Sequence, residues 1–276
     1  MKYIAIPVFL FFISCNSTKK NLATDTVNHL PATVEKASAV PAKAHFYIYI
    51  LAGQSNMAGR GLVQPQDTVP SPHVLALDKN NEWVYAKEPL HYYEPERTGL
   101  DCGLSYGKKL SGLYGKDITI GLVPCAVGGS SIEQWLGDST YRDISLYSNL
   151  IKKAKLAAQY GIIKGILWHQ GESNAGYASY KNFPQKLQSF FTKLRNDLGN
   201  PDLPVYAGEL ASFLNKRSNP FADSVNSDLQ QLSVTMKNFY VIKTNDLTPK
   251  PDSIHFNSTS QRIMGERFAL QVYKTR

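Results

Sequence analysis

The chain has 276 residues and is 43% hydrophobic, which is enough for one sizeable core, and a single domain is the default at this length. It carries 30 Lys and Arg against 22 Asp and Glu, a formal net charge of +8, but these charges are scattered and form no dense basic stripe beside aromatic residues. This distribution argues against nucleic-acid binding. The sequence shows no fixed-period repeat or heptad run, and it assigns no oligomeric state.

The N-terminal segment has the features of a bacterial export signal. Lys2 precedes an apolar run, Ile4–Ile13, that is too short to span a bilayer as a helix. The following Cys15 ends a tetrad that resembles a lipobox, although Phe12 stands where Leu is usual. Plain secretion with an incidental Cys15 is the alternative. We predict a lipoprotein-type signal over residues 1–15, lipidation of Cys15, and an exported protein anchored by lipid at a bacterial membrane, in the periplasm or at the cell surface.

Residues 16–43 are rich in Ala, Thr, Val, Pro and Lys and show neither helical nor strand periodicity. We predict that they form a flexible linker between the anchor and a folded domain over residues 44–276. The domain contains Cys102 and Cys125. Export permits a disulfide between them, and two small buried thiols are an equal alternative.

Apolar runs alternate with helical patterns along the domain. Several runs are apolar on both faces, which is typical of strands buried in a parallel sheet. The predicted strands are Phe46–Leu51, Ile118–Val123, Ile162–Trp168, Val205–Gly208 and Tyr240–Ile242. The predicted helices are Leu104–Tyr114, Leu146–Tyr160, Tyr177–Leu198, Phe221–Met236 and Ser258–Tyr273, the last with Asn257 or Ser258 as N-cap. This order predicts a three-layer α/β/α sandwich of flavodoxin-like type with about five parallel strands.

The stretch from Gly61 to Gly99 is long, irregular and rich in proline. We expect it to form a surface excursion with small strands at Val74–Leu77 and Trp83–Ala86. A long loop inside a compact domain often shapes a binding cleft.

Four polar clusters lie at the predicted strand ends and before the last helix. They read GQSNM at 53–57, GGSS at 128–131, HQGES at 169–173 and DSIHF at 252–256. Because the carboxyl ends of parallel strands share one edge of the sheet, we expect these clusters to converge. The first cluster matches neither glycine-rich phosphate-binding pattern, which excludes a nucleotide-binding loop. Its glycines permit a tight turn after the strand.

The clusters contain the parts of a serine nucleophile site. A serine hydroxyl needs a base to take its proton, and His255 is the candidate base for Ser55. A carboxylate must orient the imidazole, and Asp252, three residues before His255, can reach its second ring nitrogen. Glu172 is a competing carboxylate from another strand end. The oxyanion donors expected are the backbone N–H of Ser55, that of Gly129, and the side-chain amide of Gln170.

These motifs resemble the SGNH hydrolase superfamily, and within it the carbohydrate acetylesterase branch of carbohydrate esterase family six acetylxylan esterases and sialic-acid-specific acetylesterases. The motifs LAGQSNMAGRG, AVGGSSIEQW, WHQGESNA and DSIHF are similar to its first, second, third and fifth blocks. The resemblance covers roughly His45 to Tyr273 and implies Ser55 as nucleophile, with Asp252 and His255 completing a triad. It also implies Gly129 and Gln170 as oxyanion donors. In some members of this branch the third-block glutamate, here Glu172, is proposed to orient the histidine.

Four further residues of these blocks are candidate sugar contacts: Gln54, Asn56, Arg60 and Trp135. Packing is an equal alternative for the tryptophan, and a simple surface charge is the alternative for the arginine. The histidines outside the clusters show no metal-ligand spacing, so no metal and no cofactor is predicted.

The sequence therefore predicts a serine esterase that removes O-acetyl groups from carbohydrate through an acetyl-enzyme. Acetylated xylan or a related hemicellulose is the expected substrate, because a compact domain tethered at a bacterial surface suits it. O-acetylated sialic acid is the alternative, although enzymes of that type often carry extra domains. An alternative of another class is a glycan-binding surface lipoprotein without catalysis.

Overall fold

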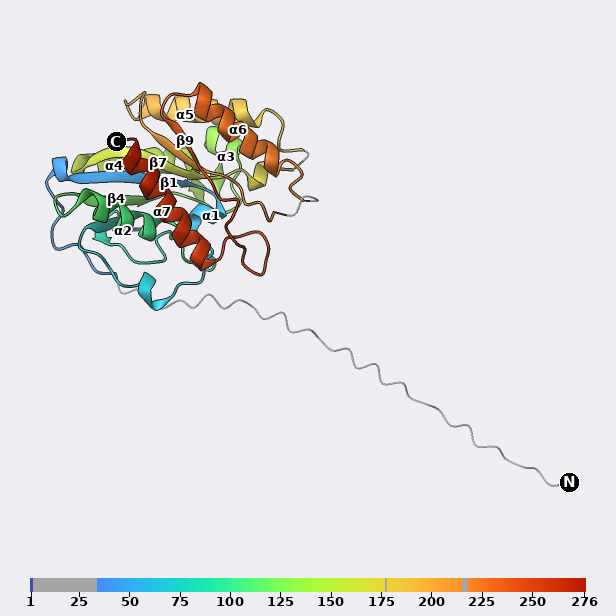
Figure 1. Ribbon diagram of the computed structural model, residues 1–276, viewed down its shortest axis with the longest axis horizontal. Helices are drawn as coiled ribbons and strands as arrows, with labels where there is room; N and C mark the ends of the chain where they lie inside the picture. Colours follow the sequence, from blue (N-terminus) through green and yellow to red (C-terminus); the bar gives the residue numbers. More distant parts are fainter. Residues whose placement is uncertain (2–33, 177, 215–217) are drawn as a thin grey trace.

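The computed structural model describes Met1 and residues 34–276, with the exception of residues 177 and 215–217. The predicted signal with Cys15 and most of the predicted linker lie outside the described residues. A mostly parallel sheet with helices on both faces forms a three-layer sandwich, which confirms the predicted fold class (Figure 1). No helix in the described part of the chain has both the length and the apolar character needed to cross a bilayer.

Five parallel strands correspond to the five predicted runs. They are β1 Phe46–Gly53, β4 Thr119–Pro124, β7 Ile162–His169, β8 Val205–Gly208 and β9 Phe239–Ile242. Nearly every residue of β1 and all residues of β4 are buried, because helices cover both faces of the sheet. Strand β1 lies between β4 and β7, so three of the four polar clusters follow neighbouring strands at one edge.

The sheet is larger than the five strands predicted. The short strands β2 Val74–Leu77 and β3 Trp83–Tyr85 do not form a separate excursion, since they extend the same sheet in the order β3-β2-β4-β1-β7-β8-β9. Strand β2 runs parallel to β4, and β3 pairs with it antiparallel. All four residues of β2 are apolar and buried, and pairing with β4 is what buries them.

The predicted linker ends earlier than residue 43. Lys36 forms an isolated antiparallel bridge with Val84 of β3, and the N–H of Tyr85 donates to the carbonyl of Glu35 at 2.9 Å. These contacts satisfy backbone groups that an outer strand otherwise leaves unpaired. The segment that begins at Glu35 is therefore held against the edge of the domain.

The five long helices agree with the predicted ones, apart from one boundary. They are α2 Gly103–Tyr114, α4 Leu146–Tyr160, α5 Phe183–Asp197, α6 Ala222–Thr235 and α7 Ser258–Lys274. Helix α5 begins later than predicted, because Asn182 is left-handed (φ 59°) and Pro184 fits only a first helical turn. Helices α2 and α7 pack together on one face, while α4, α5 and the short α3 (Ile132–Leu136) cover the other (Figure 1).

Candidate active site

The end of β1 presents the serine. Gly53 has φ +134°, and a Cβ there would lie 2.1 Å from the carbonyl oxygen of His169, so only glycine lets β1 approach β7 this closely. The N–H of Gln54 donates to the same oxygen at 2.8 Å. Ser55 then begins the short helix α1, Ser55–Ala58, with its hydroxyl at the carboxyl edge of the sheet.

The structure brings Ser55, His255 and Asp252 into one hydrogen-bonded chain. His255 Nε2 lies 3.0 Å from Ser55 Oγ, and His255 Nδ1 lies 2.9 Å from Asp252 Oδ2. These distances are within reach for proton transfer and for orienting the ring. The serine is buried, while the side chains of His255 and Asp252 are 20% and 36% exposed, so the chain of residues opens to the surface at its histidine end.

The Asp252 turn holds His255 in place before any substrate arrives. Oxygen Oδ1 of Asp252 accepts the N–H groups of Ile254 and His255, each at 2.9 Å, while Oδ2 faces the imidazole. Partial burial favours the neutral acid, but these hydrogen bonds outweigh it and lower the pKa of Asp252 below its ordinary value. The carboxylate is therefore ionised wherever the imidazole works as a base.

Glu172 does not contact His255. Its Oε1 accepts a 2.7 Å hydrogen bond from Asn56 Nδ2 and lies 3.6 Å from Nδ1 of the buried His169. Asn56 in turn accepts from the N–H of Phe256 at 3.1 Å and approaches the carbonyl of Ile254 at 3.5 Å. Asn56 thus holds both neighbours of His255, and Glu172 holds Asn56.

This arrangement separates the two candidate carboxylates and corrects one expectation, that Asn56 contacts the sugar. In the structure Asp252, not Glu172, is the carboxylate against the ring of His255. Asn56 is fully buried, so a sugar does not reach it. Asn56 and Glu172 are both buried and support the backbone on either side of His255 through Asn56.

Two backbone N–H groups that the sequence predicts as oxyanion donors lie at the carboxyl edge of the sheet. The N–H of Ser55 begins α1 and therefore has no partner within the helix. Gly129 has φ +80°, its carbonyl accepts from Ser173 Oγ at 3.0 Å, and its N–H meets no acceptor among the described residues. Both lie at the carboxyl edge, where Ser130 Oγ donates to the carbonyl of Gly53 at 3.3 Å.

Gln170 is placed differently from the expectation. Its side chain is fully buried, and Nε2 donates toward Asn174 Oδ1 at 2.7 Å, the Ser130 carbonyl at 3.2 Å and Gln54 Oε1 at 3.3 Å. These acceptors use both of its N–H bonds, so an oxyanion would have to displace one of them. The structure therefore shows Gln170 as a brace between the second and third clusters.

Of the predicted sugar contacts, Trp135 is clearly wrong. It is fully buried in a ring cluster with Trp168 and Phe190, and its Nε1 donates to Ser130 Oγ at 2.8 Å. Gln54 is almost fully buried, and its Oε1 accepts from the N–H of Ser173 at 3.2 Å. The large apolar ring of Trp135 and the hydrogen-bonded amide of Gln54 are both stable in the interior, so being close to Ser55 in a motif does not make them sugar contacts.

Arg60 lies at the rim but is engaged there. Its guanidinium donates to Glu94 at 2.9 Å, and the same carboxylate accepts the N–H of Gly128 at 2.5 Å. Arg142 adds a bond from Nε to the carbonyl of Gly128 at 3.0 Å. Sequence reasoning missed Glu94 and Arg142, because the first lies in the proline-rich stretch and the second in a short hairpin, and neither belongs to a recognisable motif.

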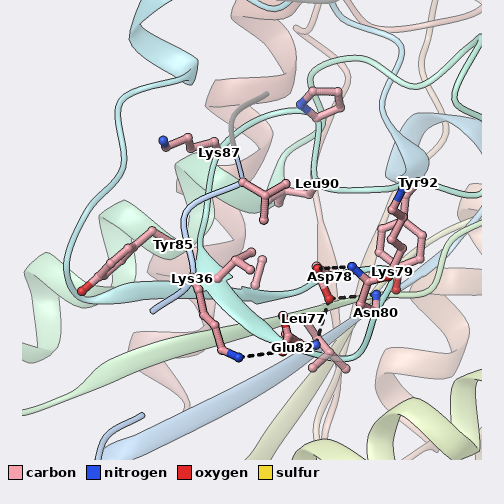
Figure 2. Close-up of a pocket in the computed structure, with 14 residues that line it drawn as sticks. Lys36, Leu77, Asp78, Lys79, Asn80, Glu82, Tyr85, Lys87, Leu90 and Tyr92 are labelled. Carbon is pink, nitrogen blue, oxygen red and sulfur yellow. Dashed lines mark hydrogen bonds and ion pairs between the residues drawn. The ribbon is translucent and has the colours of Figure 1, made fainter. Parts of the chain in front are cut away.

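A separate hollow lies away from the triad. This cavity, of about 290 Å³, lies between β2, β3 and the loop that follows. Figure 2 shows Lys36, Leu77, Tyr85, Leu90 and Tyr92 among its walls. Ser55, His255 and Asp252 do not line this cavity, so it is separate from the candidate active site.

The two cysteines of the domain are not bonded to each other. Cys102 and Cys125 are buried and free, so the disulfide alternative is wrong for this structure. Among the described residues no group of His, Cys, Asp and Glu is arranged to hold a metal ion.

A serine hydrogen-bonded to a histidine that a carboxylate orients, at the carboxyl edge of a parallel α/β sheet, is the arrangement typical of hydrolases with a serine nucleophile. Residues 45–274 match the family model described as "Carbohydrate esterase, sialic acid-specific acetylesterase". The chain belongs to this family of carbohydrate esterases and is a carboxylic ester hydrolase, so the alternative of a glycan-binding protein without catalysis is not retained.

Relatives agree with this assignment. The chain is 30% identical to a probable carbohydrate esterase of Arabidopsis thaliana over 239 residues, which cover 79% of this chain and 86% of the relative. A solved structure of an Arabidopsis thaliana protein is similar with a TM-score of 0.73 and 29% identity, covering 86% of this chain and 99% of that one. The structure of NanS, at 19% identity and a TM-score of 0.67, covers 86% of this chain and 99% of its own and shares the fold.

Proposed function

We propose that the protein removes O-acetyl groups from acetylated xylan or a related hemicellulose through an acetyl-enzyme on Ser55. The observation that carries the proposal is the chain of hydrogen bonds from Ser55 Oγ through His255 to Asp252, at 3.0 and 2.9 Å. The partly exposed histidine and aspartate support a polymeric substrate, because a glycan chain can lie across an open rim that it could not enter if the site were enclosed.

Acetyl transfer to the enzyme is the first half of the proposed reaction. Ser55 Oγ attacks the acetyl carbonyl carbon while His255 Nε2 takes the hydroxyl proton, and the carbonyl electrons move onto the oxygen. The N–H groups of Ser55 and Gly129 stabilise that negative charge. When the tetrahedral intermediate collapses, the bond to the sugar oxygen breaks and His255 returns the proton to that oxygen.

Deacylation repeats these steps with water. His255 takes a proton from water, the hydroxide attacks the acetyl carbon, and the ester bond to Ser55 breaks. The proton passes to Ser55 Oγ and acetate leaves. Asp252 holds the imidazole and stabilises its cation in both halves, for which its lowered pKa is suited.

O-acetylated sialic acid is the second candidate substrate. The family model that matches residues 45–274 is described by that specificity. Arg60 and Arg142 also lie near the glycine pair 128–129, and an anionic sugar is attracted to such a rim.

The test combines substrate comparison with labelling of the nucleophile. Purified protein is given acetylated xylan and O-acetyl sialic acid side by side, and acetate release is measured. Wild type is expected to release acetate from xylan, and Ser55→Ala to lose about a thousandfold or more in kcat. A serine-reactive phosphonate should add its mass to the peptide that contains Ser55. A label on another residue, or full activity of the alanine variant, would refute the mechanism.

We further propose that the protein is exported and held at a bacterial membrane through lipid on Cys15, with the catalytic domain carried on the segment that follows. The lipobox-like tetrad before Cys15 supports this. Expression of Cys15→Ala beside wild type tests it: wild type should partition with membranes and incorporate labelled fatty acid, and the variant should do neither. Equal partitioning of the two would refute the anchor.

A further inference from the structure

A tight hairpin lies next to the glycine pair 128–129 of the second cluster. It consists of β5 Thr140–Tyr141 and β6 Ile144–Ser145, and its two turn residues, Arg142 and Asp143, have φ of 50° and 61°. A two-residue hairpin turn of this kind favours Asn and Gly, because other side chains are strained at positive φ. Backbone strain at a site edge points to a functional placement of the residues that bear it.

The hairpin directs its side chains at Gly129. A Cβ on Gly129 would lie 2.9 Å from the hydroxyl of Tyr141 and 3.9 Å from Arg142 Nη2. Arg142 is held there by its Nε, which donates to the carbonyl of Gly128 at 3.0 Å. The guanidinium therefore lies beside the glycine whose N–H faces the developing oxyanion in the proposed reaction.

The charges around this guanidinium do not balance. Glu94 is the single carboxylate between two arginines, 2.9 Å from Arg60 Nη2 and 3.4 Å from Arg142 Nη1. Its side chain is 3% exposed, whereas that of Arg142 is 32% exposed. Nη2 of Arg142 meets no acceptor among the described residues, so a positive group with free N–H bonds faces solvent at the rim.

We propose that Arg142 binds a carboxylate of the acetylated sugar, with the Tyr141 hydroxyl beside it, and so selects anionic substrates. The guanidinium is held through Nε by the Gly128 carbonyl and through Nη1 by Glu94, so its Nη2 is left to donate a charge-assisted hydrogen bond to a carboxylate. The inference rests on the proposed function, because it assigns the substrate of the Ser55 site. The carboxylate can come from a uronic acid branch of a hemicellulose or from a sialic acid, and the two sources share this chemistry.

The experiment measures the ratio of kcat/KM for an anionic to a neutral acetylated substrate. The substrates are acetylated xylo-oligosaccharide with a glucuronic acid branch, the same without the branch, and O-acetyl sialic acid. Arg142→Ala should lower the ratio for at least one anionic substrate about tenfold or more, chiefly through KM, and Arg142→Lys should lower it less. Lys152→Ala, which removes an exposed charge from α4, should leave the ratio unchanged.

Inhibition keeps the test independent of the natural ester. Glucuronic acid and sialic acid are added as competitors of p-nitrophenyl acetate hydrolysis, and Arg142→Ala should raise the inhibition constant of one of them about tenfold. Equal losses on charged and neutral substrates would mean that Arg142 only positions Gly128, and an unchanged ratio with unchanged inhibition would also overturn the proposal. Loss of the proposed function itself has another signature: no acetylated sugar is cleaved by wild type, although p-nitrophenyl acetate is.

Discussion

Ser55 and Asn56 are neighbours in sequence, yet they belong to two regions of opposite character. In the upper region, which is the one nearer solvent, Ser55, His255 and Asp252 form a hydrogen-bonded chain whose histidine and aspartate are partly exposed. In the buried region, Asn56 is hydrogen-bonded to Glu172 and holds the backbone on both sides of His255. The difference teaches that one short motif supplies both the reacting group and the support that fixes its partner.

The largest expected effect separates the two carboxylates. Asp252→Asn should lower kcat about a thousandfold or more, because the amide cannot stabilise the imidazolium. Glu172→Gln should lower kcat about tenfold or less, since its carbonyl oxygen can still accept from Asn56. Acetate release at saturating substrate measures both, and an equal or greater loss in Glu172→Gln would show that the buried region takes part in the chemistry.

Asn56→Ala tests whether the buried region acts by positioning. It leaves the Glu172 carboxylate and the Phe256 N–H without partners, so we expect about 2–4 kcal/mol of lost stability and about a hundredfold lower kcat. Urea unfolding and kinetics measure the two losses.

Asn226→Ala is the matched control for that variant, because Asn226 holds the N–H and carbonyl of Leu210 in the same way, at 2.7 and 3.0 Å. It should lower stability without a comparable loss of kcat. If both variants lose stability and neither loses kcat, the hydrogen bonds of Asn56 are only structural and its positioning role is wrong.

Gly129→Ala probes the upper region at its oxyanion side. The left-handed φ of 80° and the approach to the Tyr141 hydroxyl should cost about 1–2 kcal/mol, with about a tenfold fall in kcat as the N–H shifts. Combining it with Tyr141→Phe removes the closest atom. The double variant should regain part of the kcat, and no recovery would assign the loss to backbone strain alone.

The last prediction concerns stability and not activity, and it compares two carboxylates that differ in burial. Asp252 has a lowered pKa, whereas burial and the neighbouring Asp101 raise the pKa of the fully buried Glu88 well above its ordinary value. The folded state therefore binds the Glu88 proton more tightly than the unfolded state does. The resulting contribution to the free energy of unfolding is fully present below the pKa of Glu88 in the unfolded chain, and it is lost as the pH rises toward the pKa in the folded protein.

Unfolding free energies at about pH 5 and about pH 8 test this expectation. Wild type should lose stability relative to Glu88→Gln by up to about 1.4 kcal/mol for each pH unit within that window. The reference variant cancels groups that titrate in both proteins. A constant difference between the two proteins would show that Glu88 does not change its protonation state on folding.

Much of this fold could be predicted because buried parallel strands are apolar on both faces. The runs at β1, β4, β7, β8 and β9 carry that signal over four or more residues. Strands β2 and β3 were also visible as short runs, but their place in the sheet depends on pairing with β4, to which local sequence gives no clue. The register of a short strand is set by its tertiary partners.

The site divides in the same way. Ser55, Asp252 and His255 were predictable because a serine nucleophile needs a base and an orienting acid, and the sequence offers an Asp and a His three residues apart just before the last helix. Burial decided the rest: Trp135 and Asn56 carry groups that could bind sugar but are fully buried. Arg142 was missed because its position depends on a two-residue turn with no pattern of its own.

Ser55 and His255 are 200 residues apart along the chain, and His255 directly precedes the helix α7 that packs on α2. The proposed nucleophile is therefore synthesised 200 residues before its base. A nascent chain that has not yet reached His255 has the nucleophile without its base, so the hydrogen-bonded chain of Ser55, His255 and Asp252 cannot form in it. Ester hydrolysis is therefore expected to report, in a single assay, that the domain has folded from β1 to α7.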